Sequence, residues 1–249
     1  MFWKRVVSFL PKKNIGDMAL ACRQFASLVS ESVCWDIATI NAANGSVFPM
    51  RSCRCVIADV DCLPLKLCDA IVPISLRFSV YFNRPLEKLP LSLEGLVFSN
   101  CFNQPILPGV LPPLLTHLVF RAGFNQSIGH GVLPPTLKYL AFFFDFDQPI
   151  ERGVLPSSLT SLHFGFDFNQ PLAPGVLPSS LTSLEFGYKF NQPILPGVLP
   201  PSLTSLEFGY HFNQQLTADS SPPSLRVVKL SKFSQLSLLF ASNISVVYT

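Results

Sequence analysis

The chain has 249 residues, a formal net charge of +3 and 13% charged residues, about half the usual share. An apolar fraction of 49% excludes a disordered acidic or basic tail protein, and the small net charge argues against a general nucleic-acid-binding protein. No apolar run approaches the roughly 18–20 residues of a membrane-spanning helix, so the sequence predicts no membrane segment.

The first residues lack the pattern of a secretion signal, because the apolar run from Val6 to Leu10 is short and Pro11 follows it directly. We therefore expect a cytoplasmic or nuclear protein that is not secreted and whose seven cysteines are reduced. Four cysteines lie close together, but their spacing differs from the paired C-x2-C pattern of structural zinc sites. We expect no metal and no cofactor, with buried free thiols as the interpretation and zinc as the alternative. These cysteines are Cys53, Cys55, Cys62 and Cys68.

Residues 1–40 lack the repeat that fills most of the chain, and their apolar residues recur at three and four positions, which predicts a helix. Asn14 occupies the N-cap position of this helix, with Asp17 three residues later. The sequence therefore predicts a small helical segment before the repeats. Its apolar positions are Ile15, Met18, Ala19, Cys22, Phe25, Ala26 and Val29.

The same segment contains Leu10-Pro11, the run Met18–Phe25 with its Cys-Arg-x-Phe sequence, and Trp35, which together resemble the later two thirds of an F-box. The opening Leu-Pro and first acidic turn of that family are absent. The resemblance implies binding to the Skp-type adaptor of a cullin–RING ubiquitin ligase. The alternative is a helical cap on the first coil of the repeats. The adaptor-binding residues that the resemblance implies are Leu10, Pro11, Ile15 and Met18.

Residues 41–72 are the predicted linker and N-terminal cap of the repeats. Their first part, Asn41–Ser46, has the composition of a loop. Val56–Ala58 is a candidate degenerate strand, and the first clear strand contains Leu76–Phe78.

Residues 73–235 contain a repeat whose period is 22 residues over most of its length. The phrase Phe-Asn-Gln-Pro recurs with variants, and a Leu-Pro-Pro-Ser-Leu phrase keeps the same period. In one unit, Leu181-x-x-Leu184-x-Phe186 alternates apolar residues as a short strand does, and Pro-Gly and Pro-Pro turns follow. Each unit is therefore one strand with an irregular return, without room for a long helix.

A unit of this kind cannot bury its own apolar face, so the units must stack around one shared core. The predicted fold class is a repeat solenoid, mainly β, in which a right-handed coil forms one parallel sheet of about seven or more strands. One Leu column and two Phe columns are expected inside it, which explains the 23 Phe residues. The Phe columns are Phe98, Phe120, Phe142, Phe164, Phe186 and Phe208, and Phe102, Phe124, Phe146, Phe168, Phe190 and Phe212.

One Asn position recurs at the turn after the second Phe of each unit. An amide has both donors and an acceptor, so a buried Asn there can satisfy backbone groups of its own coil and the adjacent coil. A catalytic role would need charged or nucleophilic companions in the same coil, and the sequence places none there. We therefore interpret the column as a structural ladder. Its members are Asn103, Asn125, Asp147, Asn169, Asn191 and Asn213.

The pattern Leu-x-x-Leu-x-Phe-x-x-x-Phe-Asn-Gln-Pro resembles the FNIP repeat, a relative of the leucine-rich repeat, over residues 73–235. The resemblance implies a curved or arc-shaped solenoid that binds proteins. Asp147 and Ser127 depart from the pattern, and the last unit is weak. Residues 236–249 are expected to supply a C-terminal cap strand. An F-box followed by FNIP or leucine-rich repeats is a familiar arrangement, which favours the F-box interpretation of residues 1–40.

Enzyme motifs such as G-x-S-x-G, the P-loop and H-x3-H do not occur, and the four His residues lie in different coils. We therefore expect a non-enzymatic protein-interaction module. In the first hypothesis it is the substrate-recruiting F-box subunit of a cullin–RING ubiquitin ligase, with an unidentified target protein on the solenoid and no nucleic-acid or membrane partner. The alternative is an FNIP or leucine-rich-repeat scaffold or binding protein without a ubiquitin role, whose N-terminal helices are only a cap.

The outward strand positions are the expected target-binding surface, because they vary between coils while the Pro-Gly-Val-Leu-Pro back is nearly invariant. Exposed Tyr and Arg are enriched among binding anchors, so Arg121, Tyr139 and Phe143 are expected to be central. Ala141 is also expected to face outward, and an ordinary solvated surface is the alternative. The predicted target-binding residues are His117, Arg121, Tyr139, Phe143, His163, Glu185 and Glu207, the last two as an acidic end.

Overall fold

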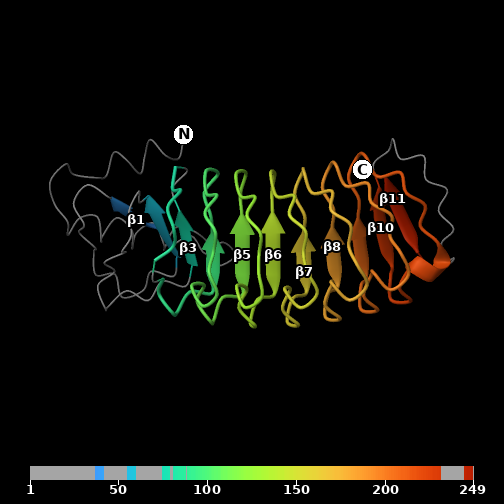
Figure 1. Cartoon of the computed structure of the whole chain (residues 1–249), viewed down its shortest axis with the longest axis horizontal. Coiled ribbons are helices and arrows are strands. Elements are labelled where there is room, and N and C mark those ends of the chain that lie inside the picture. The colour runs from blue at the N-terminus through green and yellow to red at the C-terminus, as the bar shows by residue number, and fades with distance from the viewer. Residues whose placement is uncertain are drawn as a thin grey trace, which may run out of the picture.

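The computed structural model describes residues 37–41, 55–59, 75–78, 81–87, 89–230 and 244–248. These residues form one eleven-stranded sheet, in which the strands pair in sequence order. All the strand pairs are parallel. Figure 1 shows the strands side by side in one long row, with loops at both ends of the strands. The predicted fold class, a mainly β repeat solenoid with one parallel sheet, is confirmed.

The predicted helical segment and its adaptor-binding residues lie outside the described residues, as do three of the four clustered cysteines. Within the described part of the chain, the one helix is a single 3₁₀ turn, η1, at Ala218–Ser220. No described helix has the length and hydropathy that crossing a membrane requires.

The strands have three to five residues, because each coil of about 22 residues must also contain the turns and the returning segment. β1 occupies positions where the sequence predicted the end of a helical segment and the start of a loop. The strands are β1 Ile37–Asn41, β2 Cys55–Asp59, β3 Ser75–Phe78, β4 Gly95–Val97, β5 His117–Phe120, β6 Tyr139–Phe142, β7 Ser161–His163, β8 Ser183–Glu185, β9 Ser205–Glu207, β10 Val227–Leu230 and β11 Ser245–Tyr248.

The constant period fixes the register of the sheet. Equivalent residues of successive coils are paired, as in the Leu column where Leu140 lies opposite both Leu118 and Leu162. Coils of other lengths keep this register: Ser75 pairs with Gly95, and Val227 pairs with Ser245. Differences in coil length are therefore absorbed in the returns, and the strands stay aligned.

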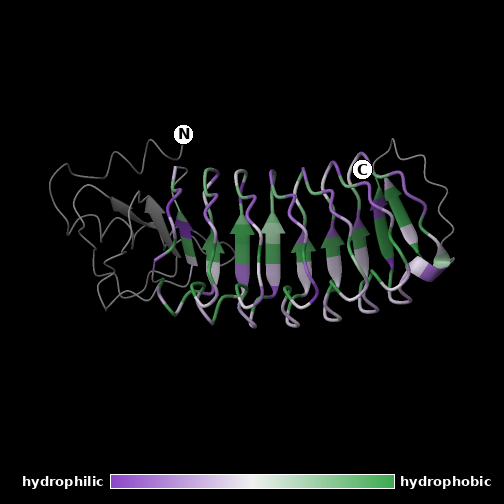
Figure 2. Cartoon of the chain, in the orientation of Figure 1, coloured by the Kyte–Doolittle hydropathy of each residue, from purple (hydrophilic) through white to green (hydrophobic). Residues whose placement is uncertain are grey.

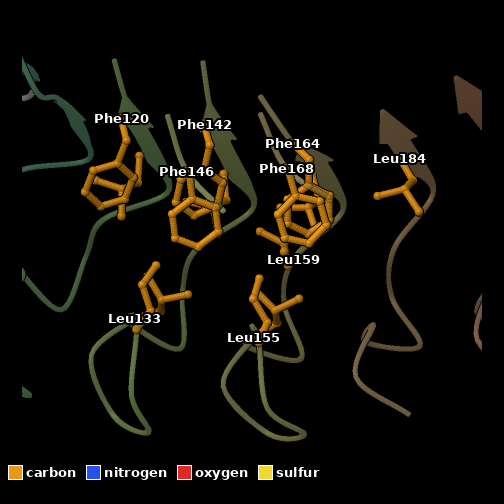
Figure 3. Packing of buried hydrophobic residues seen from close by; sticks show 14 of the residues in the cluster. Phe120, Leu133, Phe142, Phe146, Leu155, Leu159, Phe164, Phe168 and Leu184 are labelled. Atoms are coloured by element: carbon orange, nitrogen blue, oxygen red, sulfur yellow. The ribbon is translucent and has the colours of Figure 1, made fainter. Parts of the chain in front are cut away.

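The core consists of the predicted columns, which are fully buried along the solenoid. The two Phe rings of each coil stack on one another, with centroids 3.9 Å apart for Phe164 and Phe168. Rings of successive coils are further apart, at 5.6 Å between Phe164 and Phe186. Figure 3 shows the rings of Phe142, Phe146, Phe164 and Phe168 above Leu133 and Leu155, which close the core from the returning segments. Each buried Phe removes a large apolar surface from water, so the columns dominate the stability of the fold.

The Pro-Gly turns have a backbone that only glycine adopts easily. Gly175 and Gly197 both have φ of +80°, in the left-handed region where a Cβ is strained. A glycine with positive φ recurs at this turn in five coils, after Pro in three of them, and in four of the five the following Val and Leu are both buried. Hydrophobic and hydrophilic residues alternate in short stretches along every coil and do not separate into two ends of the molecule (Figure 2).

Candidate functional site

The outer face of the sheet carries two rows of residues: the first precedes the buried Leu column, and the second lies between the buried Leu and Phe columns. Their positions are half-buried in most strands, in alternation with fully buried ones. The first row contains Ser75, Gly95, His117, Tyr139, Ser161, Ser183, Ser205 and Val227. The second row contains Arg77, Val97, Val119, Ala141, His163, Glu185, Glu207 and Lys229.

One predicted outward residue is not part of the accessible surface. Ala141 is completely buried. Its register neighbours in the second row are Val119 and His163. Because a methyl group is shorter than these side chains, the row has a dip at Ala141, and this residue cannot contribute a contact of its own.

The N-terminal half of the face brings together three of the predicted residues. The rings of His117 and Tyr139 stack with centroids 5.9 Å apart, and Thr116 Oγ1 lies 2.9 Å from His117 Nδ1. Burial raises the pKa of Tyr139, and the charge of Glu185 raises it further. Arg121 is half-buried beyond the end of β5. Burial lowers the pKa of Arg121, and the positive charge of Arg77 lowers it further.

Phe143 follows β6 and is 45% exposed, with its ring 5.7 Å from that of His163. Phe143 and Arg121 occupy equivalent positions in neighbouring coils, because each directly follows a residue of the Phe120–Phe142 pair. The structure therefore places the three residues predicted to be central, Arg121, Tyr139 and Phe143, on two adjacent strands and their ends.

The C-terminal half of the face has paired charges. His163 Nδ1 lies 2.8 Å from Glu185 Oε2, and Lys229 Nζ donates to Glu207 Oε2 at 2.9 Å. The hydrogen bond from His163 lowers the pKa of Glu185. The predicted acidic end at Glu185 and Glu207 is thus not a free acidic surface, because a neighbouring strand supplies each carboxylate with a partner.

A column of exposed aromatic side chains was missed by the sequence analysis. Phe144, Phe166, Tyr188 and Tyr210 lie in successive coils, two residues after the inward Phe, and are 37–51% exposed. Their rings stack, with centroids 4.5 Å apart for Phe166 and Tyr188 and 5.1 Å apart for Tyr188 and Tyr210. The recurrence of an aromatic residue at this position in four units is the sequence signal that could have revealed them.

Glycine makes this stacking possible. A Cβ on Gly187 would lie 1.9 Å from the carbonyl oxygen of Gly165, and a Cβ on Gly209 would lie 2.1 Å from that of Gly187. No side chain fits at that distance, so glycine lets successive backbones approach closely. In the preceding coils the equivalent residues are Arg121 and Phe143, whose side chains extend onto the sheet face.

The Asn column links each coil to the next through its side-chain oxygen. Asn169 Oδ1 accepts from the backbone N–H of Asn191 at 2.9 Å and from Gln192 Nε2 at 3.2 Å. Asp147 accepts equivalent bonds from Asn169 and Gln170 at 2.8 Å and 3.0 Å. The column is half-buried or exposed and not buried as the sequence suggested.

Only acceptors are used in this column. No side-chain amide nitrogen of these Asn residues donates a hydrogen bond within the described part of the chain. A carboxylate at position 147 therefore supplies what the next coil needs. An open depression lies beside the column, lined by Asn169, Lys189, Asn191 and His211.

The described residues bring together no cluster with metal-binding chemistry: no group of three His, Cys, Asp or Glu side chains lies where a metal ion could bind. Cys101 is an exposed free thiol. The candidate site on the described coils is therefore the pair of outer rows on the sheet face.

The comparisons with known proteins agree with the coil geometry. The family model described as FNIP Repeat matches residues 102–144, 146–189 and 190–233, more than half of the chain. A solved structure titled as the crystal structure of CroV588, a novel circular LRR protein, is 40% identical with a TM-score of 0.69. The similarity covers 77% of this chain and 31% of that one, so this chain spans about a third of that protein's length. No curated protein matches the chain.

Repeat solenoids of this kind are generally binding scaffolds, which indicates a protein-interaction module. One explanation accounts for three observations: the 22-residue period, the stacked Leu and Phe columns, and the family match over three stretches of the chain. The chain belongs to the FNIP repeat proteins and has a leucine-rich-repeat-like solenoid fold.

Proposed function

We propose that this chain binds a target protein on the outer face of its sheet. The observation that carries the proposal is the contrast between that face and the rest of each coil. Core columns, turns and the Asn column repeat almost unchanged, whereas the two outer rows change chemistry between strands from β3 to β8 and repeat only between β8 and β9. A surface that differs along an otherwise uniform solenoid supplies the variety that specific recognition needs.

The centre of the target-binding surface is Arg121, Tyr139 and Phe143. These side chains are half-buried or exposed, and two of them are aromatic. Tyr and Arg are the residue types that most often dominate binding energy at protein interfaces. The predicted residues His117, His163, Glu185 and Glu207 extend the surface along the strands.

The chain also acts, in this proposal, as the substrate-recruiting subunit of a cullin–RING ubiquitin ligase in the cytoplasm or nucleus. The support is the F-box-like sequence of residues 1–40, in which Leu10, Pro11, Ile15 and Met18 would contact the Skp-type adaptor. A solenoid that holds a target beside such a segment would bring the target to the ligase. The alternative remains a scaffold protein whose first residues only cap the solenoid.

Selection from a random peptide-display library with the full chain tests the binding face. The triple variant Arg121→Ala, Tyr139→Ala, Phe143→Ala should retain at most a tenth of the selected-peptide binding, with an unchanged thermal midpoint. The matched control is Leu107→Ala, Leu195→Ala, which removes exposed apolar side chains from the Pro-Gly turns. The proposal is wrong if the control variant loses binding and the face variant does not.

A pull-down of purified Skp-type adaptor with the full chain tests the second part. The variant Leu10→Ala, Pro11→Ala should abolish adaptor binding and leave the thermal midpoint of the repeats unchanged. Binding that persists in the variant would reject these contact residues. Absence of binding by the unmodified chain would favour the scaffold alternative.

A further inference from the structure

The two halves of the sheet face differ in how their charges are neutralised. In the C-terminal half, Glu185 and Glu207 have partners in His163 and Lys229. In the N-terminal half, Arg121 has no ion pair or side-chain hydrogen bond with any described residue. Its electrostatic neighbour is another cation, Arg77.

The register places no acidic residue next to Arg121 in the outer rows of the described strands. Arg77 lies in β3, two strands from β5, with Val97 and Val119 beside it in the second row. Asp59 at the end of β2 is two residues beyond Ile57, the register partner of Arg77, so an acidic position lies diagonally to Arg77. No acidic residue occupies the outer rows between β4 and β6.

Apolar and aromatic groups border the two arginines. Val97 and Val119 are half-buried between them. His117 and Tyr139 form a stacked pair on one side, and Phe143 is exposed on the other. We name these seven residues the cationic patch: Arg77, Val97, His117, Val119, Arg121, Tyr139 and Phe143.

We propose that the cationic patch binds an extended segment of the target protein in which Asp or Glu alternates with apolar residues. The inference rests on the proposed function, since it names the chemistry of a partner on the same face. A carboxylate accepts two parallel hydrogen bonds from a guanidinium, which suits half-buried arginine. The valines and aromatic rings fit the apolar residues between the carboxylates.

The spacing of the patch matches an extended chain. Strands of a sheet are about 4.8 Å apart, and Arg121 lies two residues, about 7 Å, beyond Val119, which is in register with Arg77, so the two backbones are about 12 Å apart. Alternate residues of an extended segment lie about 7 Å apart on the same side. Two long arginine side chains can therefore approach two carboxylates of such a segment that runs across the strands.

Fluorescence anisotropy of the full chain with three labelled twelve-residue peptides tests the inference. The first peptide alternates Glu and Val between Ser-Gly ends, the second has Gln for each Glu, and the third has Lys for each Glu. We expect the Glu peptide to bind at least tenfold more tightly than the other two, and to weaken at least tenfold between 50 and 300 mM salt, since exposed charges are screened.

The variant Arg121→Glu should reduce binding of the Glu peptide at least tenfold. Arg84→Glu is the matched control, because it makes the same change of charge at an exposed loop residue outside the patch and should bind normally. Equal binding of the Glu and Gln peptides, absence of binding by the Glu peptide, or unchanged binding by Arg121→Glu would each overturn the inference. So would salt-sensitive self-association of the chain in sedimentation that Arg121→Glu abolishes, because a second copy would then occupy the patch.

The peptide-display selection separates this inference from the proposed function. Selected peptides that depend on the sheet face but lack acidic residues would overturn the inference and leave the proposed function standing. Selected peptides that bind independently of the face would overturn the proposed function.

Discussion

The solenoid has two halves with the same core columns and different residues at the ends of their strands. From β4 to β6, the residue directly after the inward Phe is Ser99, Arg121 or Phe143, whereas from β7 to β9 it is Gly165, Gly187 or Gly209. The core columns pass through both halves without interruption. One position in a coil of 22 residues therefore decides what the end of each strand presents to solvent.

In the glycine half the coils close on one another. The backbone bond from the N–H of Lys189 to the carbonyl of Phe166, at 2.9 Å, has an equivalent in the other half, from Asp145 to Ala122 at 3.0 Å. The glycine half differs in that its backbones leave no space for a Cβ at Gly187 or Gly209. In the other half, Arg121 and Phe143 extend from the same position. The position after the inward Phe is therefore filled by close backbone contact in the glycine half and by a large side chain at Arg121 and Phe143 in the other half.

Removal of a core ring has the largest expected effect and tests whether the interiors are equivalent. Phe120→Ala and Phe164→Ala should each lower the free energy of unfolding by about 3–5 kcal/mol, because both rings are fully buried and a cavity remains. Urea unfolding followed by circular dichroism would measure it. The control Phe166→Ala removes a 37% exposed ring and should cost about 1 kcal/mol. A clear difference between the two core variants would contradict equivalent interiors.

Substitution of the closely packed glycine comes next. Gly187→Ala should lower the free energy of unfolding by about 3 kcal/mol, because its Cβ meets the backbone of Gly165 and the coils must move apart. Gly129→Ala is the matched control, since a Cβ there has no atom within 4 Å. Near-ultraviolet circular dichroism should change with Gly187→Ala as the Tyr188 ring loses its stacking. Equal unfolding midpoints for the two variants would remove the distinction between the halves.

The Asn column crosses both halves, and two substitutions in it test whether the side-chain acceptor oxygen is the group that matters. Asn169→Ala leaves the N–H of Asn191 without its acceptor and should cost about 1–3 kcal/mol, whereas Gln192 Nε2 keeps the backbone carbonyl of residue 169 as an acceptor at 3.0 Å. Asp147→Asn should change the free energy of unfolding by less than about 0.5 kcal/mol, since an acceptor oxygen remains. Guanidinium unfolding midpoints compare them, and a strongly destabilised Asp147→Asn would give that carboxylate a separate role.

The smallest expected effect concerns the paired charges of the C-terminal half. The pKa of Glu185 is lowered from its ordinary value of 4.5 by the hydrogen bond from His163. A lowered pKa means that the pair contributes its full stability above the unfolded pKa and loses it as the pH falls through the folded pKa. Glu185→Gln should therefore cost less than about 1 kcal/mol at pH 7, because the side chain is 41% exposed.

The same variant should show almost no difference from the unmodified chain at a pH well below 4.5. Thermal midpoints from pH 7 to pH 3 would measure this. Glu151→Gln is the control, because Glu151 is exposed and forms no ion pair among the described residues. A stability difference for Glu185→Gln that grows as the pH falls would show that the sign of the linkage is wrong.

The sequence by itself determined the solenoid, its parallel sheet, its register and its Leu and Phe columns. It could do so because a constant period makes each coil the template of the next: Leu162 can pair with Leu140 and Leu184 only if the coils stack. The family followed from the same repeated positions. The face of the sheet was predictable too, since strand residues alternate between inside and outside, with Ala141 as the exception.

The tertiary structure alone decided how neighbouring coils meet. The sequence gives no distance between residues 22 positions apart, so the partners of Glu185 and Glu207 and the contact at Gly187 emerged only from the stacked coils. The Asn column was likewise recognisable, but its use of oxygen alone depends on which backbone group faces it. The ion pairs, the close backbone contact at Gly187 and the cationic neighbour of Arg121 all arise between different coils. Such interactions depend on short distances between atoms, which only the folded structure shows.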